Sequence, residues 1–165
     1  MTSAVLEEAL KKAALAWISV GDGPALGLWC MPLAGSLIVV TGPGEQFAPG
    51  LAEASRAAVR LRGDNGGLIV VCEMAVAGIA PGTDEWAEVA PQLAQKRLNA
   101  SGSADEVVAR WAESGCAVVR LTPSEQDAPV TAPDLPADSG ATAPRETPAR
   151  VETTRPFRLH RVRRP

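Results

Sequence analysis

Apolar residues recur at helical spacing near the start of the chain, at Leu6, Leu10 and Ala14. Glu7 and Glu8 lie in the early turns of this segment, where carboxylates interact favourably with the positive end of a helix dipole. The pattern therefore predicts an amphipathic first helix at the start of the chain.

Shorter apolar runs follow, and they are rich in residues that favour β-strands. Turn-forming Gly and Pro residues at 21–24 and 32–35 separate the first three runs, which predicts an antiparallel meander. A further turn is expected at Asp64-Asn-Gly-Gly67, where Asn and Gly tolerate positive φ. Strands are expected over residues 15–20, 25–31, 36–40, 56–61, 68–80 and 116–121.

After residue 82 the spacing of the apolar residues changes to the one typical of helices. One face of a helix is indicated by Trp86, Val89, Leu93 and Leu98, although Pro91 should kink or split this helix. Ser103-Ala-Asp-Glu106 fits a capping box at the start of the next helix, and Gly115 lies where a left-handed cap is expected.

The composition shifts abruptly after Pro123. Seven prolines occur in residues 124–165, with almost no large apolar side chains, and such a segment cannot bury enough surface to offset its ordering entropy. We therefore expect one folded domain over residues 4–123 and a disordered tail over 124–165. The end of this tail, 155–165, has five arginines and no acidic residue, so it could dock on the acidic core, bind an acidic partner, or have no partner.

The charge and the cysteines narrow the class of protein. Residues 1–123 carry nine Lys and Arg against 13 Asp and Glu, a net charge of −4, which argues against nucleic acid as a partner. The three cysteines are odd in number and widely spaced, so we expect reduced, buried thiols.

Neither a secretory signal nor a membrane-spanning run is evident, which predicts a cytoplasmic protein. The excess of Arg over Lys, 13 to 3, is typical of GC-rich bacteria.

Few residues can carry acid-base or metal chemistry. His160, in the tail, is the only histidine, and there is no tyrosine. Ser-His-Asp and Cys-His schemes, and zinc or iron sites, need imidazoles or clustered thiolates that the folded part of this sequence lacks. If the protein catalyses a reaction, we therefore expect a cofactor to carry the chemistry.

Four segments, in this order along residues 4–123, point to a known family. They are Leu28-Trp29, the loop Thr41-Gly-Pro-Gly-Glu-Gln46 after a strand, Arg60-Leu-Arg62, and Trp86 with Lys96-Arg-Leu-Asn99. The order resembles the pyridoxamine 5'-phosphate oxidase-like, FMN-binding split-barrel family. The resemblance implies an α+β, mainly β fold: a six-stranded antiparallel split β-barrel with peripheral helices.

The resemblance also implies a homodimer with FMN, or a related deazaflavin, bound between the subunits. In this family the flavin phosphate is held by strand arginines and by a lysine just past the strand that ends in Thr. No lysine lies between Lys12 and Lys96 here, and Gln46 stands near the expected position. The resemblance implies cofactor-binding roles for Trp29, Thr41, Gly42, Gly44, Arg60 and Arg62.

Each of these features also has a purely structural explanation. The Gly-rich loop is typical of a tight turn, the two arginines of a solvated strand face, and Trp29 of a core or interface aromatic. Two functions follow. The first, which we favour, is a flavin- or deazaflavin-dependent oxidoreductase of unknown substrate. The alternative is a cofactor-free, degenerate split barrel that acts as a dimeric binding or scaffold module, with the Arg-rich tail as its contact segment.

Overall fold

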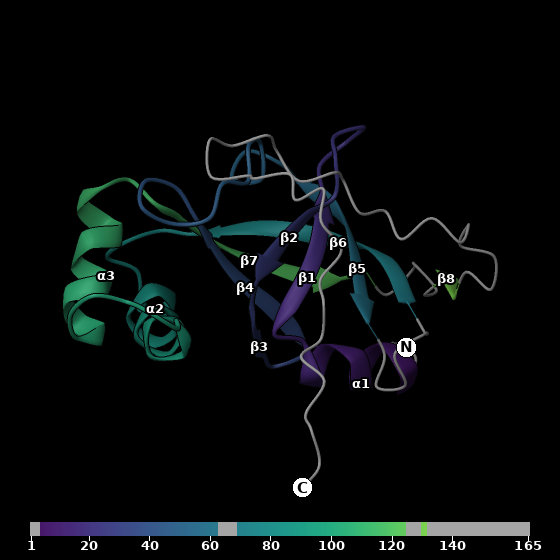
Figure 1. Ribbon diagram of the computed structural model, residues 1–165, viewed down its shortest axis with the longest axis horizontal. Coiled ribbons are helices and arrows are strands. Elements are labelled where there is room, and N and C mark those ends of the chain that lie inside the picture. Colours follow the sequence, from purple (N-terminus) through teal and green to yellow (C-terminus); the bar gives the residue numbers. More distant parts are fainter. Residues whose placement is uncertain (1–3, 63–68, 125–129, 132–165) are drawn as a thin grey trace, which may run out of the picture. The chain divides into compact units, whose positions relative to one another are not determined.

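The computed structural model describes residues 4–62, 69–124 and 130–131 (Figure 1). The chain divides into the units Met1–Pro133 and Asp134–Pro165, and all described residues belong to the first. Most of the predicted disordered tail, and the predicted turn at 64–67, lie outside the described residues. The elements are α1 (Ala4–Lys12), β1 (Leu15–Ser19), β2 (Leu26–Trp29), β3 (Met31–Leu33), β4 (Ser36–Thr41), β5 (Arg56–Arg62), β6 (Ile69–Ile79), α2 (Asp84–Lys96), α3 (Ala104–Glu113), β7 (Ala117–Pro123) and β8 (Val130–Thr131).

The strands form an antiparallel sheet that curls into a nearly closed barrel, with the order β2-β1-β5-β6-β7-β4-β3. The two-residue strand β8 pairs with β6 beside this path. The strands at the two ends of the order, β2 and β3, are separated in the chain by Cys30 alone. The chain itself therefore links the two edges of the sheet. This architecture confirms the predicted antiparallel split barrel with peripheral helices.

The prediction of six strands was wrong, because the sheet path contains seven. The apolar run at 25–31 divides at Cys30, since its first part pairs with β1 and its second part with β4. At this corner the Cys30 amide donates to the Ala14 carbonyl at 3.1 Å, and the Cys30 thiol lies 3.8 Å from the Ala13 carbonyl. The sequence gives no sign of the division, because apolar residues continue through the corner.

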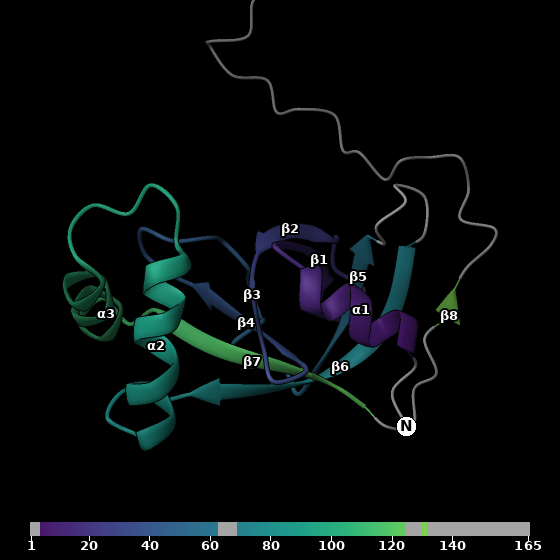
Figure 2. The same cartoon turned by 90° about the horizontal axis from the view of Figure 1, so that it is seen from below.

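One hydrophobic core fills the barrel. Inward-facing side chains of β1, β4, β5, β6 and β7 pack with Leu6 and Leu10 of α1, both at most 2% exposed. The helix α1 therefore covers one end of the barrel, as the view in Figure 2 shows. The predicted amphipathic first helix is confirmed, with Leu6, Ala9 and Leu10 on its buried side. The predicted place of Ala14 on this face was wrong, because α1 ends at Lys12 and Ala14 is exposed.

A second core lies outside the barrel. Here α2 and α3 pack against the outer side of β4 and β7, on the side of the barrel where Figure 1 shows both helices. All six residues of β4 are consequently buried, which explains why this strand is apolar without alternation. Trp111 of α3 is fully buried in this second core.

The helix signals in the sequence are largely confirmed. Ser103 and Glu106 form the predicted capping box of α3, and Gly115 follows this helix with a φ of 71°. Pro91 neither splits nor ends α2, which runs from Asp84 to Lys96 as one helix. Leu98, however, lies beyond the end of α2 and is 85% exposed, so its predicted place on the buried helix face was wrong.

Candidate ligand-binding site

The Gly-rich loop after β4 is held together by its own hydrogen bonds. The Thr41 hydroxyl donates to the Gln46 carbonyl at 2.9 Å and accepts from the Ala48 amide at 3.1 Å. The Gly42 amide donates to the same Gln46 carbonyl at 3.1 Å. Thr41 and Gly42, both predicted as ligands of a flavin phosphate, therefore have partners within the loop and just after it.

The two glycines of the loop differ in their surroundings. Gly42 has a φ of 138°, and a Cβ at this position would lie 2.9 Å from Cα of Cys116. Gly44 has a φ of 73° and open space around it. The Cys116 thiol donates to the Pro43 carbonyl at 3.4 Å, and burial, aided by the nearby Glu45 carboxylate, raises the pKa of this thiol. The loop is thus packed closely against the start of β7.

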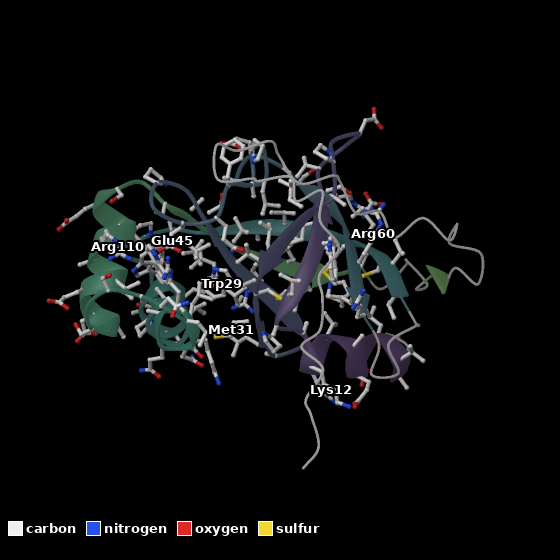
Figure 3. All side chains as sticks on the ribbon, in the orientation of Figure 1. Lys12, Trp29, Met31, Glu45, Arg60 and Arg110 are labelled. Carbon is white, nitrogen blue, oxygen red and sulfur yellow. The ribbon has the colours of Figure 1, made fainter. Side chains whose placement is uncertain are left out.

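Glu45 is the buried charge of this loop. Its side chain is 1% exposed, and its carboxylate accepts hydrogen bonds from Arg97 Nε at 2.7 Å, Trp111 Nε1 at 2.9 Å and Arg110 Nη2 at 3.5 Å. Figure 3 shows Glu45 and Arg110 together beside α2 and α3. A buried carboxylate needs such charged and hydrogen-bonding partners to offset its lost hydration. Glu45 therefore fastens the loop to both helices.

Gln46 occupies the place where the family resemblance leads one to expect a lysine. Its Oε1 accepts from the Trp29 amide at 2.6 Å, and its Nε2 donates to the carbonyls of Trp29 at 3.0 Å and Val40 at 3.2 Å. An amide can both donate and accept, as these backbone groups require, whereas a lysine ammonium can only donate. Gln46 thus satisfies backbone groups where β2 leaves the sheet.

Arg60 and Arg62 lie on the outer face of β5, away from the Gly-rich loop. Arg60 Nη1 donates to Ser19 Oγ at 3.4 Å, and the Arg62 guanidinium lies over the Trp17 ring, 5.7 Å from its centroid. In Figure 3, Arg60 and Glu45 are on opposite sides of the barrel. The structure therefore does not bring the two predicted halves of the phosphate site together within one chain.

A pocket of about 510 Å³ lies between the end of α1, the β2–β3 corner and the end of α2. All three lysines of the chain line it, and we call it the lysine pocket. Its walls include Lys11, Lys12, Lys96, Trp29, Met31 and Leu98. A second pocket of about 270 Å³ adjoins it at residues 12–14 and is lined by Trp17 and Arg62. Two predicted site residues, Trp29 and Arg62, therefore lie in adjoining pockets.

The lysine pocket combines positive charge with apolar and aromatic surface. Lys12 forms an ion pair with Glu8 at 2.6 Å, whereas no ion pair of Lys11 or Lys96 is found among the described residues. Cys30, in the pocket wall, is a buried thiol whose pKa is raised to about 12 by burial, so it stays uncharged at neutral pH. The pocket is thus lined by three lysines together with a tryptophan.

Sequence reasoning missed the lysines. In the sequence, Lys96 stood out only as part of the segment 96–99, and Lys12 only as one end of a stretch that contains no lysine. The available signal was their rarity: a chain with 13 arginines has only three lysines. Nothing in the sequence places Lys96 beside Lys11, because 84 residues separate them.

The part of the chain that the structure describes contains no helix of the length and apolarity needed to cross a membrane. Within the same part, no group of three or more His, Cys, Asp and Glu side chains is arranged to hold a metal ion.

The sequence matches no family profile and no curated protein, but the structure is similar to solved ones. The heme storage protein HutZ from Vibrio cholerae matches 73% of this chain and 88% of its own, at 9% identity and a TM-score of 0.53. A putative 5-nitroimidazole antibiotic resistance protein from Bacteroides thetaiotaomicron matches over 74% and 79%, at 13% identity and a TM-score of 0.50. A putative pyridoxamine 5'-phosphate oxidase from Listeria innocua matches over 74% and 93%, at 12% identity and a TM-score of 0.49.

These likenesses concern the fold. They confirm that the chain has the split-barrel fold that the sequence resemblance implied. At 9 to 13% identity they do not extend to a ligand or a substrate.

Proposed function

We propose that this protein binds a flavin phosphate, FMN or a deazaflavin, in the lysine pocket and acts as an oxidoreductase on a small substrate. The observation that carries the proposal is the convergence of all three lysines and Trp29 on one pocket. A flavin combines a flat aromatic ring with an anionic phosphate, and this pocket offers groups that complement both.

The residues present fit such a cofactor. A phosphate monoester carries nearly two negative charges at neutral pH, and Lys11 and Lys96 are cations without a recorded carboxylate partner in the described chain. The volume of about 510 Å³ lies within the usual range of small-molecule sites, and the half-buried Trp29 offers aromatic surface to a ring. The cofactor would supply hydride transfer, while these residues would bind it and orient it.

Arg62 extends the positive surface of the lysine pocket into the adjoining one. Among the described residues, the only contact found for its guanidinium is the one with Trp17. Arg62 could therefore form a charge-assisted bond to a phosphate without breaking an ion pair. Arg60 already donates to Ser19. We therefore propose Arg62 as the stronger phosphate ligand of the two. Thr41, Gly42, Gly44 and Arg60 remain predictions, as does the homodimer that the family resemblance implies.

Calorimetric titration with FMN and riboflavin tests the site. Lys11→Gln and Lys96→Gln should each weaken FMN binding by about 1.5–3 kcal/mol, roughly ten- to a hundredfold, because each removes a charge-assisted contact to the phosphate. Riboflavin lacks the phosphate, so its affinity should be almost unchanged. Arg120→Gln is the control, because Arg120 pairs with Glu85 elsewhere on the surface.

The outcomes separate the two functions. Equal FMN affinity in all variants would refute the lysine pocket as the phosphate site. If the wild-type protein bound neither ligand, the cofactor-free binding or scaffold module would replace the flavin proposal. FMN could bind and be reduced by a hydride donor without any turnover of an electron acceptor. That result would refute the oxidoreductase activity but not the binding of FMN.

A further inference from the structure

We infer that Glu45 and Gln46, consecutive residues of the Gly-rich loop, hold the two walls of the lysine pocket in place. This inference rests on the proposed function, because it assigns the loop a positioning role for the ligand of that pocket. The loop would then shape the pocket through Trp29 and Arg97.

Gln46 holds the first wall. Its side-chain amide pairs with both the N–H and the carbonyl of Trp29, at 2.6 and 3.0 Å, as a neighbouring strand would. Trp29 is the last residue of β2, where the chain turns away toward β3, and it lines the pocket. Without Gln46 the backbone groups of Trp29 would lose this partner at the point where the sheet is interrupted.

Glu45 holds the second wall through Arg97. Arg97 Nε donates to the buried carboxylate at 2.7 Å, and its Nη1 donates to the Leu98 carbonyl at 3.3 Å. Lys96 and Leu98, the neighbours of Arg97 on either side, both line the pocket. One guanidinium therefore ties the segment that carries this wall to a carboxylate that is only 1% exposed.

Contacts within the loop and with β7 fix the position of the loop. Gly42 packs against Cys116, and the hydroxyl of Thr41 and the amide of Gly42 both bind the Gln46 carbonyl. Glu45 closes the turn through its amide, which donates to the Gly42 carbonyl at 3.0 Å, and from there its side chain reaches Arg97 while that of Gln46 reaches Trp29. A displacement of the loop would consequently move both walls together.

Arg97→Gln and Arg110→Gln are a matched pair for the second wall. Each removes one guanidinium from the Glu45 carboxylate, but only Arg97 also binds the Leu98 carbonyl. We expect Arg97→Gln to weaken FMN binding about tenfold and to speed amide hydrogen exchange in residues 96–99. Arg110→Gln should change neither by more than about twofold. Equal effects of the two variants, or no effect of Arg97→Gln, would overturn the role of Glu45.

Gln46→Ala tests the first wall, with Gln92→Ala as its control. Gln92 also donates its side-chain amide to a backbone carbonyl, but on the exposed side of α2. Only Gln46→Ala should speed exchange of the Trp29 amide and weaken FMN binding. If wild-type protein bound no FMN, the proposed function would be refuted. The rates of amide hydrogen exchange would still decide whether the loop holds the walls. Unchanged exchange at Trp29 in Gln46→Ala would refute the inference whether or not FMN binds.

Discussion

The indole Nε1 of Trp111 donates a hydrogen bond to the carboxylate of Glu45 at 2.9 Å. The two residues lie 66 positions apart, one in α3 and the other in the loop that follows β4. Both side chains are almost completely buried, and Arg97 and Arg110 supply the opposite charge. This contact joins the outer core to the loop, so the stability of the protein and the shape of the lysine pocket depend on the same carboxylate.

Removing the charge of Glu45 should destabilise the fold. Glu45→Gln keeps the size of the side chain but replaces charge-assisted hydrogen bonds in a buried site, and we expect the free energy of unfolding to fall by about 1.5–3 kcal/mol. Urea denaturation followed by tryptophan fluorescence measures this change. Glu85→Gln is the control, because Glu85 is 46% exposed and its pair with Arg120 should contribute at most about 1 kcal/mol. Equal losses in the two variants would show that the Glu45 cluster does not stabilise the fold as proposed.

Local signals predicted most of the fold. The capping box at Ser103 and Glu106, and the left-handed residue Gly115, act within a few positions of the chain, so they can be identified from the sequence. The corner at Cys30 depends on contacts with Ala13 and Ala14, which are distant in the sequence. For this reason one predicted strand proved to be two, which form opposite edges of the sheet.

The candidate site was harder to predict for the same reason. Trp29 and Arg62, which line adjoining pockets, were predicted as site residues, but they were grouped with a Gly-rich loop whose donors Thr41 and Gly42 have partners nearby. A motif shows which residues could bind a phosphate; it does not show which of their polar groups the fold already uses. The lysine pocket arises where three separate elements meet, and no local pattern records that meeting.

The two glycines of the loop should respond differently to alanine. Gly44→Ala places a Cβ in open space at a φ of 73°, so only backbone strain opposes it, at a cost of about 1–2 kcal/mol. Gly42→Ala adds a contact of 2.9 Å with the Cys116 backbone, and overpacking of this kind costs about 1–3 kcal/mol more. The unfolding midpoints of both variants in urea test this order. A smaller loss for Gly42→Ala than for Gly44→Ala would contradict the close packing of the loop against β7.

Cys30 should make the stability of the protein depend on pH in the alkaline range. Burial raises the pKa of its thiol from 9.0 to about 12, so the folded protein keeps the proton that the unfolded chain loses. The protonated Cys30 thiol therefore makes its full contribution to the free energy of unfolding below pH 9, and this contribution is lost as the pH rises from about 9 to about 12. Between about pH 8 and about pH 10 this loss should amount to about 1 kcal/mol.

Cys30→Ala isolates this effect from the other groups that titrate in the same range. The substitution will change the absolute stability by leaving a small cavity, but that change does not depend on pH. The loss of stability between about pH 8 and about pH 10 should be smaller in the variant by about 1 kcal/mol, as measured by urea denaturation at both values. Cys116, whose pKa is also raised by burial, contributes equally to both proteins and cancels in the comparison. An identical pH dependence in the two proteins would show that the Cys30 thiol ionises as readily in the folded state as in the unfolded chain.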